Sequence, residues 1–510
     1  MPTLAELKSK WFIPMSGDVL GVPCRRHDGA QSQLSASTDG NVVTPLIDGE
    51  AYMARWRGEL LKLHHKPGAE FMHTGWRLDD VKTLGKTKAG GEALAAMNDA
   101  DGASVACFVL ACRNLACLFS NVPSLIKLDL NAAPALDERF PIAGSNHQKF
   151  SVFKSADAAV AMLGSVDITK DRWDRIKHET GDLDRPKTPT HDAGVAIKGP
   201  AVRDVELTYR ERWNDSTRTI GLTPGIVPRP LITSAPAASS PVGAPAEHTH
   251  SVQILRTYGI TRELFGYSWS PSGEFTVWAS YLNAITKAEQ YIYIEDQYCL
   301  PWGWPPRFAL SGNSRSVDII FQLGEAMKRG VQVAILVPGK DEDPTAIWQK
   351  YQRDIGVNYL TGVKAAGASG DIVVASLTNG TTSIYVHSKL MIVDDELVLI
   401  GSANVGQRSM THDGELHAGV VDSDGKFARE LRQALWAEHT GRGAETLGDP
   451  LAAYALFAED TAASVHHRLR PYPVNPNVVF PPAADTPEPW YAHVMIMSFI
   501  EPFAGPPGLA

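Results

Sequence analysis

Two short segments of this 510-residue chain place a lysine two positions after a histidine. The stronger segment is His387-Ser388-Lys389, followed by Asp394 in the spacing H-x-K-x-x-x-x-D, and a weaker copy is His147-Gln148-Lys149. On a strand, residues two apart share one face, so each histidine and its lysine would point at one small volume. Imidazole attacks or carries protons near neutral pH, and an ammonium suits phosphate oxygens. The two segments predict one phosphodiester site that uses two histidines.

The composition is that of an ordinary globular protein, with 44% hydrophobic and 21% charged residues and a net charge of -9. This acidic balance argues against a surface devoted to nucleic acid, so we expect no nucleic-acid partner. Five cysteines without a C-x-x-C pair predict buried thiols. The first residues lack a signal-peptide core, and no run reaches the ~18 apolar residues of a membrane span. We therefore expect a cytoplasmic protein, with signal-free export as an effector left open.

The stretch 223–250 contains six prolines and little apolar periodicity, which is typical of a semi-extended linker. It divides the chain into residues 1–222 and 251–510, and the two parts look like diverged copies. Each part has a His-x-Lys segment, then a Gly-Ser pair (Gly164-Ser165 and Gly401-Ser402), then a His-Asp pair (His191-Asp192 and His412-Asp413). A tryptophan follows Asp192 after 21 residues and follows Glu415 after 21 residues, at Trp213 and Trp436.

The apolar patterns predict a mixed α/β chain. Strands are expected at Tyr291–Glu295 and Val331–Val337 with a helix at Ser316–Arg329 between them, which would form a β-α-β unit. A strand pair is expected at Leu390–Val393 and Leu397–Ile400, and helices at Leu46–Leu63 and Lys426–His439. We therefore expect two similar α-β-α sandwich halves about a pseudo-two-fold axis, with both histidines at the seam.

These segments resemble the phospholipase D superfamily. The run YVHSKLMIVDDELVLIGSANVGQRSM carries the resemblance most specifically, and the first half adds HQKF, GSVD, Arg172-Trp173-Asp174 and the His191-Asp192 pair. Flanking segments also fit, at 75–79, 252–256 and 293–298, so the resemblance covers about residues 45–440. The chain departs from the family at Lys154, where an acid is expected seven residues after His147. That acid mainly supports local structure in the family, so we expect the first half to be active.

The resemblance implies a role for each residue of the site. His147 would attack phosphorus to form a phosphohistidine, and His387 would protonate the leaving alcohol and activate the incoming water, although the symmetry leaves the reverse assignment open. Lys149 and Lys389 would hold the non-bridging oxygens. The remaining candidates for binding the phosphate are Ser165, Asp167, Ser402 and Asn404.

Two acids would support the histidines. Asp192 and Glu415 could accept hydrogen bonds from the far ring nitrogens of His147 and His387, which would fix the tautomers. Asp394 completes the catalytic set and is expected to anchor the loop that presents His387. We expect no cofactor and no metal, because the lysines take over charge neutralisation and no carboxylate cluster with metal spacing stands out in the sequence. The loop 301–306 contains Trp302 and Trp304, which either face lipid or pack on the loop itself. The tail segment Val494–Ile500 is predicted to be a buried strand.

The implied activity is hydrolysis of glycerophospholipids to phosphatidic acid and a free alcohol, with transfer to another alcohol when one competes with water. The expected partner is a phospholipid surface, and the chain is expected to act as a monomer because it carries both segments. The alternatives are a phospholipid synthase of the cardiolipin or phosphatidylserine type and a nuclease of the same superfamily. A lipid-binding scaffold with a decayed first half is a further alternative, supported by Lys154 alone.

Overall fold

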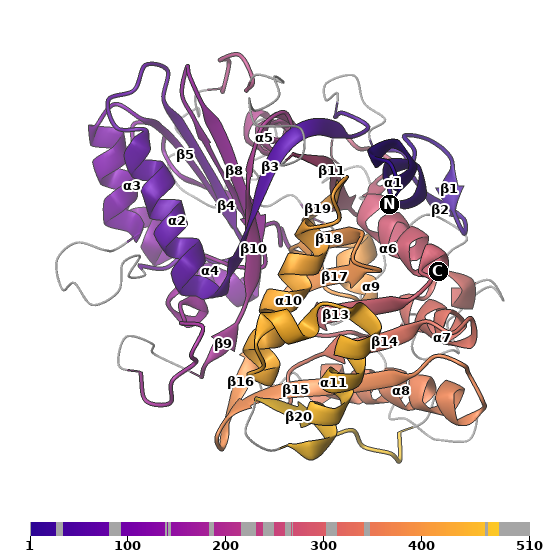
Figure 1. Cartoon of the computed structure of the whole chain (residues 1–510). Helices are drawn as coiled ribbons and strands as arrows, with labels where there is room; N and C mark the ends of the chain where they lie inside the picture. The colour runs from indigo at the N-terminus through magenta and orange to yellow at the C-terminus, as the bar shows by residue number, and fades with distance from the viewer. Residues whose placement is uncertain are drawn as a thin grey trace.

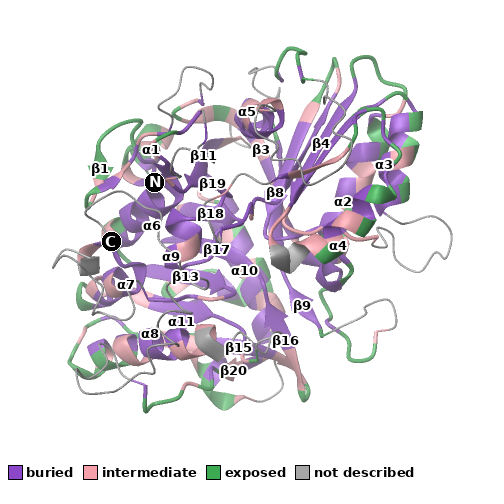
Figure 2. Ribbon diagram, turned by 180° about the vertical axis from the view of Figure 1, so that it is seen from behind, coloured by how far each residue is buried: buried purple, intermediate pink, exposed green. Residues whose placement is uncertain are grey.

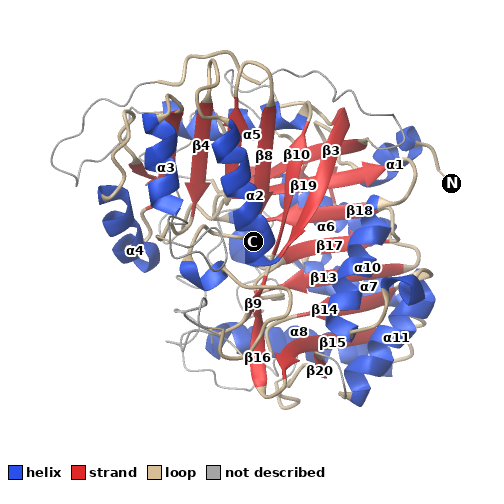
Figure 3. Ribbon diagram, turned by 60° about the vertical axis from the view of Figure 1, so that its left-hand side comes forward, coloured by secondary structure: helices blue, strands red, loops and turns tan. Residues whose placement is uncertain are grey.

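The fold is seen in a computed structural model that describes residues 2–26, 34–80, 93–137, 140, 144–182, 188–215, 231–237, 249–260, 267, 269–301, 314–340, 347–464 and 468–478. One long sheet runs through it, and helices cover both faces (Figures 1 and 3). No helix within these residues is long and apolar enough to cross a bilayer. The predicted loop with Trp302 and Trp304, the predicted strand Val494–Ile500 and most of the predicted linker lie outside the described ranges.

The first half contributes seven strands to the long sheet. In spatial order they are β6 (Ala135–Asp137), β5 (Ala106–Cys112), β4 (Glu70–Gly75), β7 (Phe150–Lys154), β8 (Ala159–Gly164), β10 (Ala193–Lys198) and β3 (Thr38–Ile47). The first three strands are parallel, and each later strand is antiparallel to the one before it.

The second half repeats this order and these directions. Its strands are β15 (Ile372–Asn379), β14 (Gln332–Leu336), β13 (Tyr291–Asp296), β17 (Lys389–Val393), β18 (Leu397–Gly401), β19 (Glu415–Asp422) and β11 (His250–Tyr258). The two series meet where β3 pairs antiparallel with β11, at His250 with Asn41 and Val252 with Thr38. An antiparallel join between two copies of one series is what a pseudo-two-fold axis produces, so the predicted α/β architecture is confirmed.

Helices cover both faces of the sheet because most of its strands are buried on both sides. On the first half lie α2 (Asp48–Lys62), α3 (Ala93–Gly102) and α4 (Leu115–Ile126), with α5 (Ala201–Asn214) on the opposite face. On the second half lie α6 (Thr276–Lys287), α7 (Ile319–Lys328) and α8 (Ile347–Ala365), opposite α10 (Phe427–Thr440) and α11 (Pro450–Ala463). One apolar core extends from α5 through the central strands to α10, so the two halves share an interior (Figure 2).

The shorter elements connect and flank this frame. They are α1 (Leu4–Trp11), α9 (Gln407–Thr411) and the strands β1 (Asp18–Val19), β2 (Val22–Pro23), β9 (Thr190–His191), β12 (Glu274–Phe275), β16 (Thr382–Val386) and β20 (Leu469–Pro471). Leu7 and Trp11 of α1 pack into the core of the second half with Leu282. The division at 222 stays a prediction, and the first residues of the chain belong structurally to the other half.

The predicted elements of the second half are confirmed. β13 and β14 are parallel with α7 between them in sequence, and β17 and β18 form the predicted antiparallel pair. The helix predicted from Leu46 begins later, at Asp48, because Leu46 and Ile47 continue β3 as partners of Gly194 and Ala193. Backbone hydrogen bonds to β10 therefore keep these two residues in a strand, although their apolar periodicity is that of a helix.

Asp394 closes the turn after β17 and binds the start of β13. Its carboxylate accepts backbone N–H bonds from Glu289, Gln290 and Tyr291 at 2.8, 2.9 and 2.9 Å. Lys154 has the equivalent place at the end of β7, and it reaches the start of β4 by an ion pair to Glu70 at 2.7 Å. The two halves therefore join the same two strand ends with opposite charges. The lysine where the family has an acid is a structural exchange, and it lies away from the histidines.

We expect Asp394→Ala to lower the free energy of unfolding by about 2–4 kcal/mol, because three backbone N–H groups lose a charged acceptor in a largely buried place. Urea unfolding followed by circular dichroism measures the change. Glu459→Ala, at an exposed position of α11, is the matched control and should shift stability by less than about 0.5 kcal/mol. Equal midpoints for the two variants would show that Asp394 has no anchoring role.

Candidate active site

Each His-x-Lys segment is held in place by the opposite half of the chain. His147 precedes β7, and its backbone N–H donates to the carbonyl of Gly414 at 2.8 Å, while Gly414 donates back to Ser145 at 2.9 Å. His387 follows β16, and its N–H donates to the carbonyl of His191 at 2.8 Å. β16 runs parallel to β9 at this point, as Figure 1 shows near the lower end of the seam. Backbone pairing across the seam thus brings both histidines to one place.

The supporting acids are exchanged between the halves as well. His147 Nδ1 lies 3.0 and 3.1 Å from the two oxygens of Glu415, and His387 Nδ1 lies 2.9 Å from Asp192 Oδ2. The expectation that these acids bind the far nitrogens of the two histidines fits this geometry, with each acid serving the histidine of the other half. With the proton on Nδ1, each ring donates to its carboxylate and leaves Nε2 free to act on a substrate.

The two serines are engaged by the supporting acids, which argues against the predicted role in binding phosphate. Ser165 Oγ donates to Asp192 Oδ1, and Ser402 Oγ donates to Glu415 Oε2 at 2.6 Å. Each serine therefore holds the second oxygen of a carboxylate whose first oxygen meets a histidine. Because a hydroxyl has a single proton to donate, these contacts use the hydrogen that a phosphate would need.

The lysines lie beside the histidines, each bonded to the carbonyl of its own histidine. Lys149 Nζ donates to His147 O at 2.9 Å and lies 3.4 Å from Asp167 Oδ2. Lys389 Nζ donates to His387 O and, at 3.0 Å, to Gln297 Oε1. Asp167 is therefore a partner of Lys149, and its negative charge disfavours a direct contact with phosphate, contrary to prediction.

Asn404 matches Asp167 in the second half and differs from it in charge. Its side chain is buried, and its Oδ1 has no hydrogen-bond partner within the described ranges of the chain. An amide can donate through its Nδ2 hydrogens, which a carboxylate cannot do, so Asn404 suits a phosphate better than Asp167 does. Of the four residues predicted to bind phosphate, Asn404 remains a candidate.

Burial and the clustered cations shape the protonation of the site. Burial, reinforced by Lys149 and Lys389, lowers the pKa of His147 well below its ordinary value, and burial with Arg172 and Lys389 does the same for His387. Burial raises the pKa of Glu415 to about 8 and also raises that of Asp192. Burial and the neighbouring Lys149 lower the pKa of Lys389 to about 7. The site therefore favours neutral imidazoles, which is the form that can attack phosphorus.

Four further side chains belong to the site and had no role in the sequence-based prediction. Arg172 is the largest charged contributor to the low pKa of His387, and its guanidinium lies 5.8 Å from the ring centroid of Tyr385. The ring of Tyr385 stacks 6.2 Å from that of His387, and the ring of Trp76 lies 5.9 Å from that of His147. Gln297 completes the set through Lys389. All four stand in segments that resembled the family, including Tyr385, the first residue of the run YVHSKLM, and that resemblance was the available signal.

Asp394 does not reach the site, so its inclusion among the catalytic residues is wrong. It lies at the opposite end of β17 from Lys389, and five strand residues span about 16 Å. Its carboxylate is also committed to the start of β13. Asp413 accepts a hydrogen bond from the backbone N–H of Ser145 at 2.7 Å and pairs with Arg408, so it shapes the segment in front of His147.

Comparison with known proteins gives matches in sequence. A protein-family model described as "Cardiolipin synthase, PLD-like domain" matches residues 281–438. Phospholipase D alpha 4 of Arabidopsis thaliana is 27% identical over 396 residues, which cover 60% of this chain and 50% of that protein. Phospholipase D alpha 1 of Zea mays is 26% identical over 490 residues, which cover 75% of this chain and 58% of that protein. The chain spans about half the length of the curated relatives it matches.

Solved structures give weaker likenesses. Phosphatidylserine synthase of Haemophilus influenzae aligns over 82% of this chain and 88% of that chain, with 12% identity and a TM-score of 0.46. Nuc of Salmonella typhimurium, a phospholipase D family member, covers 36% of this chain and 91% of its own, with 20% identity and a TM-score of 0.24.

The match of the family model spans α6 to α10 and contains His387 and Lys389, and the sequence relatives extend the likeness over more than half of the chain. The duplicated strand order and the paired His-x-Lys segments agree with that likeness. Together, the family model and the sequence relatives support membership of the phospholipase D superfamily.

Proposed function

We propose that this chain is a phospholipase D-type phosphodiesterase that hydrolyses glycerophospholipids to phosphatidic acid and a free head-group alcohol. The observation that carries the proposal is the crossed pair of buried histidine–carboxylate contacts, His147–Glu415 and His387–Asp192. Two histidines held in one tautomer beside two lysines form a site suited to a phosphate with two ester bonds. One histidine can attack while the other serves the leaving group.

In the first step, His147 Nε2 forms a bond to phosphorus, and the bond from phosphorus to the head-group oxygen breaks. His387, which must be protonated at both ring nitrogens once the substrate is bound, gives its Nε2 proton to that oxygen, so a neutral alcohol leaves. Side-chain exposure agrees with this assignment, because 14% of the His147 side chain is accessible against 4% for His387. The positive charge left on the phosphohistidine ring is stabilised by the Glu415 carboxylate behind it.

In the second step, water attacks the phosphohistidine, and His387 takes the proton of that water. The nitrogen–phosphorus bond breaks, which releases phosphatidic acid and restores both histidines. An alcohol that takes the place of water yields a new phosphodiester by the same chemistry, so transfer between head groups follows from the same intermediate.

Charge neutralisation falls to the cations that line the site. Lys149 and Lys389 each lie next to a histidine, and Arg172 acts on His387 from the first half. A phosphate bound among these cations offsets their mutual repulsion and makes protonation of His387 easier, because its low pKa arises partly from them. The negative charge that grows in the transition state gains most from this arrangement.

The proposed substrate is a glycerophospholipid because the sequence relatives are named phospholipases D. A protein that acts on phospholipid must meet a membrane surface, which we propose as its partner. Soluble, monomeric action in the cytoplasm remains part of the proposal, as does delivery of the protein to another cell. The name of the matched family model makes a synthase of the cardiolipin type the second candidate.

The deciding experiment is a product assay on vesicles of phosphatidylcholine, phosphatidylethanolamine and phosphatidylglycerol, with and without ethanol, followed by mass spectrometry. We expect phosphatidic acid, and phosphatidylethanol in its place as ethanol is raised. His147→Ala and His387→Ala should yield neither product, while His65→Ala, at an exposed position, should match the native chain.

Other products would replace the proposal. Cardiolipin formed from phosphatidylglycerol without phosphatidic acid would identify a synthase. Cleavage of plasmid DNA by a protein that leaves every lipid intact would identify a nuclease. Phosphatidic acid formed at the native rate by His147→Ala would exclude a site with two histidines.

The crossed contacts predict different defects for Glu415→Gln and Asp192→Asn. Each variant should lose roughly 10²–10⁴-fold in kcat on a natural phospholipid, because its histidine loses the orienting carboxylate. A p-nitrophenyl head group leaves as the p-nitrophenolate anion without taking up a proton. Cleavage of such a phospholipid therefore depends less on His387. We expect Asp192→Asn to regain much of its burst of p-nitrophenol in rapid-mixing experiments and Glu415→Gln to remain slow. The opposite pattern would make His387 the nucleophile.

Lys389 predicts a pH dependence of anion binding. Its pKa of about 7 is below the ordinary value for a lysine, so its positive charge is present below pH 7 and is lost as the pH rises. Tungstate keeps a constant charge in this range, so its inhibition constant should rise roughly tenfold per pH unit above pH 7. In Lys389→Met the rise of the inhibition constant with pH should be smaller. The rise that remains is expected from Glu415, which becomes negatively charged above its pKa of about 8 and repels the anion. A constant that is flat from pH 6 to 9 in the native chain would contradict the prediction.

A further inference from the structure

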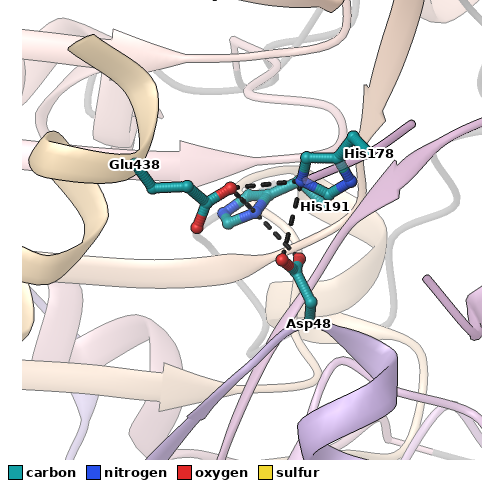
Figure 4. Close-up of side chains that lie close together, drawn as sticks. All are labelled: Asp48, His178, His191 and Glu438. Atoms are coloured by element: carbon teal, nitrogen blue, oxygen red, sulfur yellow. Dashed lines mark hydrogen bonds and ion pairs between the residues drawn. The ribbon is translucent and has the colours of Figure 1, made fainter. Parts of the chain in front are cut away.

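A second cluster of ionisable side chains lies buried at the seam, next to the proposed active site. It consists of Asp48 at the start of α2, His178, His191 of β9 and Glu438 of α10 (Figure 4). Three of its members come from the first half and one from the second. The four side chains are between 0% and 2% exposed. The proposed mechanism uses none of them.

The nitrogen and oxygen atoms of the cluster lie at separations that ligands of one metal ion could have. His178 Nε2 lies 3.6 Å from Asp48 Oδ2 and 3.1 Å from Glu438 Oε1, and His191 Nδ1 lies 3.1 Å from Asp48 Oδ1 and 3.5 Å from Glu438 Oε1. One ligand atom from each residue can be chosen so that all four lie within 4.8 Å of one another. Zinc bonds to nitrogen and oxygen of about 2.0–2.2 Å place tetrahedral ligand atoms about 3.3–3.5 Å apart. The four observed separations bracket that value.

The opposite nitrogen of each ring meets a carboxylate. His178 Nδ1 lies 2.8 Å from Asp174 Oδ2, and His191 Nε2 lies 3.0 Å from Glu295 Oε2. Histidines that bind metals almost always donate their other N–H to a carboxylate or carbonyl, which fixes the ring and makes the bound nitrogen more basic. Both rings are therefore turned so that a lone pair of each would point into the cluster.

Two carboxylate oxygens of the cluster are left without hydrogen bonds. Asp48 Oδ2 and Glu438 Oε2 are buried and have no hydrogen-bond partner within the residues that the structure describes. The other Glu438 oxygen, Oε1, lies against both rings and also accepts a hydrogen bond from Arg468 at 3.0 Å. A buried anionic oxygen without a partner is costly, and a cation removes that cost. The backbones of Asp48 and His178 also have positive φ angles of 65° and 46°, which residues other than glycine rarely adopt.

We propose that Asp48, His178, His191 and Glu438 bind one divalent transition-metal ion of the Zn²⁺ type. Two imidazoles and two carboxylates suit Zn²⁺ and its neighbours, whereas Mg²⁺ and Ca²⁺ require ligand sets made of oxygen. Four protein ligands complete a tetrahedron and leave no position for water or substrate. The ion is therefore structural, and the reaction at phosphorus does not pass through it.

The ion would stabilise the seam at the point where the second histidine is presented. His191 accepts the backbone N–H of His387, and the next residue, Asp192, holds the ring of His387. Glu438 comes from α10 of the other half, so the ion would tie the halves together directly behind these two contacts. The nearby His439 shares Glu295 with His191 through a contact of 3.0 Å, which places it around the site as a supporting residue.

The test is a measurement of bound metal on the whole purified chain. The protein is produced in medium that contains zinc, purified and extensively desalted. We expect elemental mass spectrometry to find about one zinc ion per chain. After removal of zinc with a chelator, added Co²⁺ should bind once per chain and give the intense visible bands of tetrahedral cobalt. The melting temperature of the zinc-free protein should rise by several degrees when Zn²⁺ is added.

Variants separate this site from adventitious binding. Glu438→Gln and His178→Gln should lose the metal and the cobalt bands, whereas His65→Gln, at an exposed position, should keep both. If either variant fails to fold, X-ray absorption of the cobalt-loaded native chain decides, with two imidazoles and two oxygens expected. A folded native chain that takes up neither ion, or variants that keep full stoichiometry, would overturn the proposal and leave the cluster held by protons alone. Metal content is measured without any assay of activity, so this result is independent of the proposed enzymatic function.

Discussion

The structure depends on an exchange of partners across the seam between its two halves. Each histidine takes its carboxylate and its backbone hydrogen bond from the opposite half, so neither half contains a complete site. Buried polar groups must be paired, and here they can be paired only when the halves are joined. The antiparallel contact of β3 with β11 and the shared core between α5 and α10 hold the halves in that position. A duplicated fold thereby becomes a single unit.

Much of the fold could be predicted from the sequence because local patterns decide it. Continuous apolar runs became β13, β14, β17 and β18, and the duplicated spacings reported a duplicated strand order. The start of α2 was misplaced because strand pairing of Leu46 and Ile47 with β10 is a contact with a distant segment, which local periodicity does not record. For the same reason the packing of α1 on the second half could not be predicted.

The members of the candidate site could be predicted more easily than their partners. Residue types and spacing pointed to the histidines, the lysines and the two acids. Which acid contacts which histidine depends on how the two halves pack against each other. The equal spacings within each half contain no information about that packing. The serines were misjudged because a hydroxyl beside a predicted site can serve either the ligand or a carboxylate. Here the hydrogen bond of 2.6 Å from Ser402 Oγ to Glu415 Oε2 shows that this hydroxyl serves a carboxylate. In the sequence, Lys154 is the only support for a decayed first half, and its ion pairs with Glu70 and Glu206 give it a structural role instead.

The cluster around His191 could not be predicted at all, because its members are far apart in the chain and follow no metal-binding spacing. Its placement nevertheless follows from the exchange across the seam. Strand β9 must cross to β16 in order to present Asp192 to His387, and this crossing carries His191 into the interior between Asp48 and Glu438. Charged groups buried at such a crossing need opposite charge close by. A divalent cation or imidazolium protons can each supply it. The ion has the advantage that it directs four ligands at once, whereas a proton joins only two groups.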